Sequence, residues 1–122
     1  MSHHSSLDVY QADVVWSTGI LRARQLAQEV QAAGAIYSPH TWGDGLVLLA
    51  NVQVAAAVST APFIEFPYDP PEWTPDRRDY LLPITIEAED GWVTLPSAPG
   101  LGVEIDWQAL EQWRIGTGTM EG

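Results

Sequence analysis

Apolar residues in the first half of the chain alternate between two patterns. Short apolar runs of strand length are followed by longer stretches in which apolar residues recur at helical spacing. Strands that alternate with helices indicate a parallel sheet with right-handed crossovers. The predicted order is a strand at 7–15, a helix at 20–33, a strand at 35–38, a helix at 44–58 and a strand at 62–66.

Residues with known positional preferences mark the ends of these elements. Thr18 is placed to cap the first helix, and Gly34 to end it in the left-handed conformation that glycine adopts easily. Pro39 opposes a direct turn from the second strand into a helix. Asp44 is placed to cap the second helix. These signals support separate strand and helix elements.

The pattern changes after Phe66, where proline and glycine become frequent. Asp90-Gly91 is a β-hairpin turn signal between two apolar runs, and Asp106 is placed to cap a short last helix. The predicted elements of this half are one or two helical turns at 76–82, hairpin strands at 84–87 and 92–95, a loop at 96–102 and a helix at 107–113.

Composition limits the classes of function. With 122 residues, 46% of them hydrophobic and 17% charged, the chain is typical of one globular domain. The formal net charge of −11 opposes binding to nucleic acid, since no basic patch can neutralise phosphates. The absence of cysteine excludes disulfides, thiolate metal sites and a cysteine nucleophile. No apolar run approaches the roughly 20 residues of a membrane span. We therefore expect a cytoplasmic protein with no nucleic-acid or membrane partner.

Two polar residues at strand ends are candidates for acid/base chemistry. Asp13 lies near the end of the first predicted strand, and His40 follows the second. Neighbouring parallel strands would present both side chains at one edge of the sheet. A carboxylate that accepts the proton of one imidazole nitrogen fixes the tautomer and leaves the other nitrogen to move a proton. The alternatives are that Asp13 serves the start of the helix and that His40 is a capping or packing residue.

Three segments of the chain match one known family in order and spacing. They are Gln11-Ala12-Asp13 followed by Gly19-Ile20, Ala23 and Ala27; then Ser38-Pro39-His40; and finally Asp90-Gly91, Pro96, Pro99-Gly100-Leu101-Gly102-Val103 and Asp106. Together they resemble the C-terminal part of the enolase superfamily, in its mandelate racemase and muconate-lactonizing branch. The resemblance covers roughly residues 8–115.

The resemblance implies an α/β fold that is a C-terminal fragment of a (β/α)7β TIM-like barrel. A complete barrel needs about 250 residues, so the chain would supply about three βα units and a C-terminal hairpin and loop segment. The expected organisation is a tag or disordered start at 1–6, a partial barrel at 7–66, a loop, hairpin and short helix at 67–115, and a frayed tail at 116–122.

The resemblance also implies an activity. The family abstracts a proton next to a substrate carboxylate and holds the resulting enediolate on Mg²⁺. Asp13 and His40 match its Asp–His dyad, with His40 as the proton-transfer group. Glu65 follows the eighth strand, where several members place an acid that hydrogen-bonds the substrate carboxylate; a solvated glutamate at a strand end is the alternative. The sequence around His40 resembles acid-sugar dehydratases, which implies a small sugar acid as substrate.

The chain departs from the family in what it lacks. The family's three carboxylate metal ligands and its catalytic lysine lie on strands absent from this chain, which contains no lysine. We therefore expect the isolated chain to bind no Mg²⁺ and to be inactive. Its open sheet edges and apolar face should be covered by self-association or by a complementary chain. The alternatives are a racemase or epimerase of the same superfamily, and a catalytically inert barrel remnant that acts as a structural or interaction module.

Overall fold

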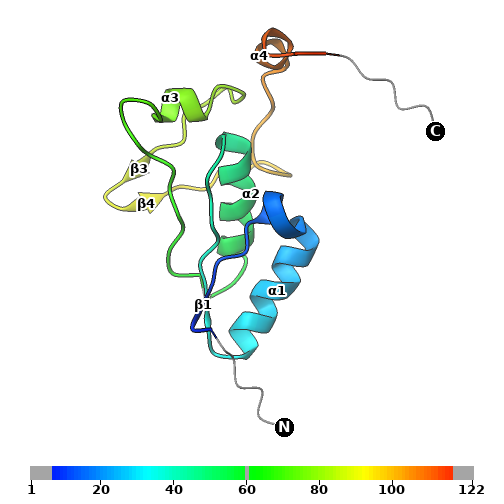
Figure 1. Ribbon diagram of the computed structural model, residues 1–122, viewed down its shortest axis with the longest axis vertical. Coiled ribbons are helices and arrows are strands. Elements are labelled where there is room, and N and C mark those ends of the chain that lie inside the picture. Colours follow the sequence, from blue (N-terminus) through cyan, green and yellow to red (C-terminus); the bar gives the residue numbers. More distant parts are fainter. Residues whose placement is uncertain (1–6, 60, 117–122) are drawn as a thin grey trace, which may run out of the picture.

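Two β-α units form the N-terminal half of the protein. The computed structural model describes residues 7–59 and 61–116. The strands β1 and β2 pair in parallel, and the helices α1 and α2 pack against each other (Figure 1). The elements in order are β1 (Val9–Tyr10), a turn of π-helix η1 (Val14–Thr18), α1 (Ile20–Ala32), β2 (Ile36–Tyr37) and α2 (Gly45–Ala56).

The strand pair is covered on one face only. Val9 lies opposite Ile36, and both remain about two-fifths exposed, at 42% and 40%. Tyr37, one position further along β2, points to the other face and is fully buried against the helices. This core consists of small and branched residues around Tyr37: Val14, Ala23, Ala27, Val30, Ala35, Ala50, Val54 and Val58. The alternation places one apolar row on an open face.

The helix α2 lies between two halves of the molecule. One side contributes to the core above, and the other packs against the C-terminal half through Leu48, Leu49 and Val52. Helices that are apolar on nearly every side are buried ones, which explains the nearly continuous apolar sequence of this element. Asp44 caps it, since its carboxylate accepts hydrogen bonds from the backbone N–H groups of Leu46 and Val47. This confirms the predicted start of α2.

The C-terminal half consists of short elements joined by loops. Asp90 and Gly91 both have positive φ, at 51° and 81°, as a tight hairpin turn requires. Figure 1 shows the hairpin and α1 on opposite sides of α2. The elements are α3 (Pro75–Arg78), β3 (Ala88–Glu89), β4 (Trp92–Val93) and α4 (Trp107–Gln112). The predicted hairpin turn and last helix are confirmed, but the first hairpin strand was placed wrongly at 84–87, since β3 lies directly before the turn at 88–89.

Two local predictions are wrong. Gly19, which has no side chain, is the N-cap of α1, and the Thr18 hydroxyl instead donates to the Gly19 carbonyl. The chain between β1 and α1 turns earlier, at Asp13, so the predicted strand at 7–15 shortens to two residues. The predicted limit at Gly34 is confirmed by its positive φ of 74°.

The third predicted strand, at 62–66, does not form within the described segment 61–68. This segment lies beside the end of β2, where the Ser38 hydroxyl donates to the Phe63 carbonyl at 3.3 Å. A strand exists only when a neighbouring backbone completes its ladder, and an apolar sequence pattern cannot supply that partner. The predictions for residues 1–6 and for the tail from 117 onward lie outside the described residues.

A buried ion pair holds the C-terminal half together. Arg78 donates from Nε and Nη2 to the two carboxylate oxygens of Asp79, both at 2.7 Å, and both side chains are buried. Arg78 also donates to the carbonyls of Pro67 and Ile86, while the Ile86 N–H donates to Asp79. The pair therefore joins the proline-rich segment, α3 and the approach to the hairpin.

The same pair lies against the start of α2. A Cβ added to Gly45 would fall 2.5 Å from Asp79 Oδ1 and 2.6 Å from Leu82 Cδ1, so only glycine allows this approach.

We expect Asp79→Ala to destabilise the protein by about 3–5 kcal/mol, because it leaves the Arg78 guanidinium buried without its charge partner. Urea unfolding followed by circular dichroism measures the change. Glu72→Ala is the matched control, since it removes the carboxylate of the exposed Arg77–Glu72 pair and should cost less than about 1 kcal/mol. Equal losses in the two variants would contradict a stabilising role for the buried pair.

Candidate active site

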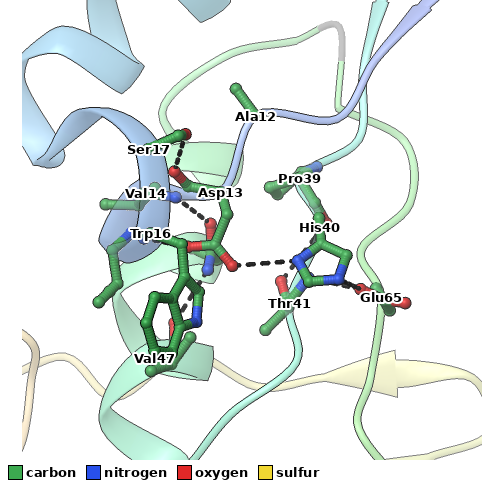
Figure 2. A network of polar contacts seen from close by, with 12 residues as sticks. Ala12, Asp13, Val14, Trp16, Ser17, Pro39, His40, Thr41, Val47 and Glu65 are labelled. Atoms are coloured by element: carbon green, nitrogen blue, oxygen red, sulfur yellow. Dashed lines mark hydrogen bonds and ion pairs between the residues drawn. The ribbon is translucent and has the colours of Figure 1, made fainter.

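The strand-to-helix turns bring Asp13 and His40 together at one edge of the sheet. Asp13 follows β1 and begins η1, and His40 follows β2. Because the strands are parallel, both side chains emerge where the strands end. Figure 2 shows the Asp13 carboxylate facing the imidazole, with Oδ2 at 3.3 Å from Nδ1. The structure thus brings together the two residues that the sequence proposed; their chemical roles stay a prediction.

The two carboxylate oxygens of Asp13 have different partners. Oδ1 accepts hydrogen bonds from the N–H groups of Val15 at 2.7 Å and Trp16 at 3.0 Å, so the side chain caps η1. Oδ2 faces His40. The side chain is only 5% exposed, whereas that of His40 is 49% exposed. Capping a helix and pairing with an imidazole are therefore not alternatives for this residue.

Glu65 approaches the other nitrogen of the imidazole. Its Oε2 accepts a hydrogen bond from the Thr41 N–H at 2.5 Å and lies 3.8 Å from His40 Nε2 (Figure 2). That distance is too long for a hydrogen bond but suits an ion pair with a protonated ring. The imidazole therefore has one carboxylate at each nitrogen, and the three predicted site residues form one cluster.

The two ring nitrogens of His40 have different surroundings. A carboxylate at Nδ1 selects the tautomer in which Nδ1 carries hydrogen and donates it. Nε2 then has a free lone pair beside Glu65, on a half-exposed ring that a ligand can reach. Such an imidazole can take up or deliver one proton at Nε2.

Buried side chains hold the backbone on both sides of Asp13. The Tyr37 hydroxyl donates to the Ala12 carbonyl at 2.9 Å, and Asn51 Oδ1 accepts from the Val14 N–H, also at 2.9 Å. Sequence reasoning did not single out either residue. The available signal for Asn51 was that only two amides, Asn51 and Gln53, interrupt the apolar sequence of α2.

Its buried environment changes the pKa of the Tyr37 phenol. Burial, and secondarily the negative charge of Asp13, raises the pKa of Tyr37 to about 12. Both effects act in the same direction, because each disfavours a phenolate.

The resemblance described above implies Mg²⁺, but the described residues of this chain do not fit a magnesium site. Within 7–59 and 61–116, no three His, Asp or Glu side chains converge to hold a metal ion. The carboxylates of Asp13 and Glu65 lie at opposite nitrogens of His40, and each already accepts backbone N–H donors. Mg²⁺ prefers several oxygens aimed at one point. These two carboxylates do not meet that requirement.

Two β-α units with a carboxylate–imidazole pair at the strand ends are consistent with part of a TIM-like barrel. The chain belongs to the family described as Enolase C-terminal domain-like, whose model matches residues 1–109. This confirms the family inferred from the three sequence segments. Among the described residues, no helix is long and apolar enough to cross a membrane.

Two curated relatives show similarity along most of the chain. A D-galactarolactone cycloisomerase from Agrobacterium fabrum (strain C58 / ATCC 33970) is 33% identical over 116 residues, which is 90% of this chain and 30% of the relative. An arabinonate dehydratase from Saccharolobus solfataricus (strain ATCC 35092 / DSM 1617 / JCM 11322 / P2) is 30% identical over 109 residues, covering 89% and 28%.

Solved structures place the fold in the mandelate racemase and muconate-lactonizing branch. A mandelate racemase-like protein from Bordetella bronchiseptica RB50, complexed with 2-oxoglutarate/phosphate, superposes with a TM-score of 0.77 at 29% identity. The match covers 93% of this chain and 30% of that protein. The chain thus spans about three-tenths of the length of the relatives it matches, in the part that carries the C-terminal domain-like fold.

Tyr37 should make stability depend on pH at the alkaline end. Its pKa is raised on folding, so the stabilisation is complete below pH 10 and is lost as pH rises through about 12. A two-unit shift corresponds to roughly 2–3 kcal/mol. Thermal unfolding by circular dichroism between pH 9 and 12 measures this loss, which Tyr37→Phe should reduce. An identical pH profile for wild type and Tyr37→Phe would contradict the assignment.

Proposed function

We propose that this chain carries the proton-transfer half of an enolase-superfamily active site that dehydrates sugar acids. The observation that supports this most strongly is the 3.3 Å contact between His40 Nδ1 and Asp13 Oδ2, with Nε2 left on the accessible side. The C–H bond next to a carboxylate is very weakly acidic. Its removal needs a base in a fixed orientation and an electrostatic partner for the charge that develops.

In the proposed reaction, His40 moves a proton at Nε2. The bond between the α-carbon and its hydrogen breaks, the proton passes to a base, and the electron pair moves into the carboxylate to give an enediolate. The electrons then return as the bond to the β-hydroxyl breaks, and that hydroxyl leaves as water with a proton from an acid. His40 serves as the base of the first step or the acid of the second. Asp13 holds the ring in the orientation that exposes Nε2.

Glu65 is proposed to contact the substrate carboxylate as a protonated acid. Its Oε2 lies 3.8 Å from His40 Nε2 and accepts the Thr41 N–H, so a substrate carboxylate held there would bring its α-carbon towards the imidazole. Partial exposure, at 41%, leaves this side chain accessible to a ligand. Two carboxyl groups can share a hydrogen bond only when one is protonated.

The chain is proposed to act as one part of a complete barrel. The expected count of three βα units requires the extended segment at 62–66 to become a paired strand once a neighbouring strand is present. The open face of the strand pair favours completion of the barrel. Val9 and Ile36 are exposed on the face opposite the helices, and in a complete barrel branched residues on that face fill the interior. A complementary chain or a second copy would cover this face, and a complementary part would supply the Mg²⁺ ligands.

The division of the chain follows from the same proposal. Residues 7–66 supply barrel units, and residues 67–115 form the segment that closes over α2 through the buried Arg78–Asp79 pair.

The similarity leaves the outcome after proton abstraction open between two chemistries. By their names, the arabinonate dehydratase removes water from a sugar acid and the D-galactarolactone cycloisomerase rearranges a lactone. Both would use the same half-site, as would a racemase or epimerase. We propose dehydration, on the resemblance around His40 and the similarity to the dehydratase.

A second candidate function is that of a structural or interaction module without catalysis. It is favoured by one observation: Val9 and Ile36 leave an exposed apolar row on the strand pair. Such a module would keep the exposed apolar row of the strands as its contact surface.

His40→Gln should abolish α-proton exchange in the completed protein, formed by combining this chain with a polypeptide that supplies the remaining barrel strands. Loss of a general acid/base group lowers the rate by about 10²–10⁴-fold. Incorporation of deuterium at the α-carbon of arabinonate or D-galactarolactone in D₂O, followed by NMR, measures the step whatever group leaves afterwards. Asp13→Asn should also slow exchange.

Glu72→Gln is the matched control for that experiment, because it neutralises an exposed carboxylate paired with Arg77, away from His40. It should leave exchange unchanged. Exchange that survives His40→Gln would overturn the assignment of His40, and a completed wild-type protein that exchanges no proton with any sugar acid would favour the module.

The isolated chain should associate in solution. Open strand edges and an exposed apolar row favour a dimer or larger species at micromolar concentration. Light scattering coupled to size exclusion measures the mass. The double variant Val9→Thr, Ile36→Thr should shift it towards monomer, whereas Val93→Thr on the distant hairpin should not. A compact, cooperatively folding monomer would contradict the proposed open face.

A further inference from the structure

We infer that Asn51 is a positioning residue for the Asp13–His40 pair. This role rests on the proposed function, since it concerns the orientation of the carboxylate that serves His40. Asn51 lies in the middle of α2, and no part of its side chain reaches solvent. Its neighbours on the helix, Ala50 and Val52, belong to the two apolar cores.

A buried amide in such a place is costly unless its polar atoms are paired. Both polar atoms of the Asn51 side chain have a hydrogen-bond partner. Its Oδ1 accepts from the Val14 N–H at 2.9 Å, and its Nδ2 donates to the Val47 carbonyl at 3.2 Å, one turn back along α2. An apolar side chain would suit the surrounding core equally well, so the amide points to a requirement of the Asp13 turn.

That requirement is the first N–H group of η1. The N-terminal N–H groups of a helical turn have no acceptor within the turn and need one outside it. Asp13 Oδ1 accepts two of them, from Val15 and Trp16, and Asn51 accepts the remaining one, from Val14. Because Asn51 satisfies Val14, Asp13 keeps Oδ2 for His40.

Removing the amide would leave a buried N–H group next in the chain to Asp13. Val14 is 1% exposed, so water cannot easily replace the lost acceptor. The Asp13 carboxylate, one peptide away, is the nearest alternative by covalent connection. Rotation of the carboxylate towards this N–H would draw Oδ2 away from His40 Nδ1 and weaken the preference for one tautomer.

The backbone before Asp13 is held independently. The Tyr37 hydroxyl, from β2, donates to the Ala12 carbonyl. Asp13 is thus flanked by one hydrogen bond from the neighbouring strand and one from α2. Two anchors of this kind restrict the peptide on each side of the carboxylate, which is what a fixed acid/base geometry requires.

The test measures the tautomer of His40 in the full 122-residue chain, with ¹⁵N-labelled histidine and with His3 and His4 replaced by Gln. Two-bond ¹H–¹⁵N correlations, recorded where the ring is neutral, distinguish hydrogen on Nδ1 from hydrogen on Nε2. Asn51→Ala should lower the ratio of the Nδ1–H to the Nε2–H form by roughly fivefold, the effect of losing one net hydrogen bond.

Val54→Ala is the matched control. It creates a cavity in the same helix and the same core but removes no hydrogen bond of the Asp13 turn, and it should leave the ratio unchanged. A ratio that shifts in Asn51→Ala and not in Val54→Ala supports positioning. Equal shifts in both variants, or none in either, overturn it. A wild-type ring without a dominant Nδ1–H form overturns both this inference and the proposed Asp13–His40 pairing.

A second measurement decides the case if Asn51→Ala does not fold in isolation. In the completed protein, Asn51→Leu should lower kcat for α-proton exchange by at least fivefold with little change in KM, because substrate contacts remain. Unchanged kcat overturns the inference while leaving the proposed function intact. A tautomer shift in Asn51→Ala, together with a completed wild-type protein that exchanges no proton, would instead support positioning and contradict the proposed function.

Discussion

The arrangement of the site depends on how the Asp13 carboxylate divides its two oxygens. One oxygen caps the turn that leads from the first strand into the first helix, and the other faces His40. The same side chain therefore fixes a local backbone conformation and the orientation of an imidazole. Because Oδ1 is fixed by the N–H groups that it caps, the direction of Oδ2 is fixed as well. The orientation of the carboxylate towards His40 therefore follows from the fold.

The helix α2 connects this local arrangement to the rest of the molecule. It is apolar on nearly all sides because it packs between the β-α units and the C-terminal half. Its start is fixed by the Asp44 cap and by Gly45, against which Asp79 lies. Its middle supplies the amide of Asn51 to the Val14 N–H. The C-terminal half, although remote from His40 in sequence, thus holds the helix that shapes the turn at Asp13.

Much of this architecture was predictable where the determinants are local. Helical spacing defined α1 and α2, Asp44 and Asp106 defined caps, and Asp90-Gly91 defined the hairpin, since each signal acts within a few residues. The prediction of a strand at 62–66 was wrong because a β-ladder requires hydrogen bonds to the backbone of a neighbouring strand. The cap predicted at Thr18 was wrong because the Asp13 carboxylate begins the turn five residues earlier, which leaves Gly19 as the N-cap of α1.

The sequence by itself determined the family, the order of the β-α units and the identity of Asp13, His40 and Glu65 as candidates, because order along the chain maps directly onto parallel strand ends. Only the tertiary structure decided that both nitrogens of His40 face carboxylates, and that Tyr37 and Asn51 hold the backbone around Asp13. The physical reason is distance in sequence. Contacts between residues 25 to 37 positions apart depend on how helices and strands pack, and no local pattern of residue types records that packing.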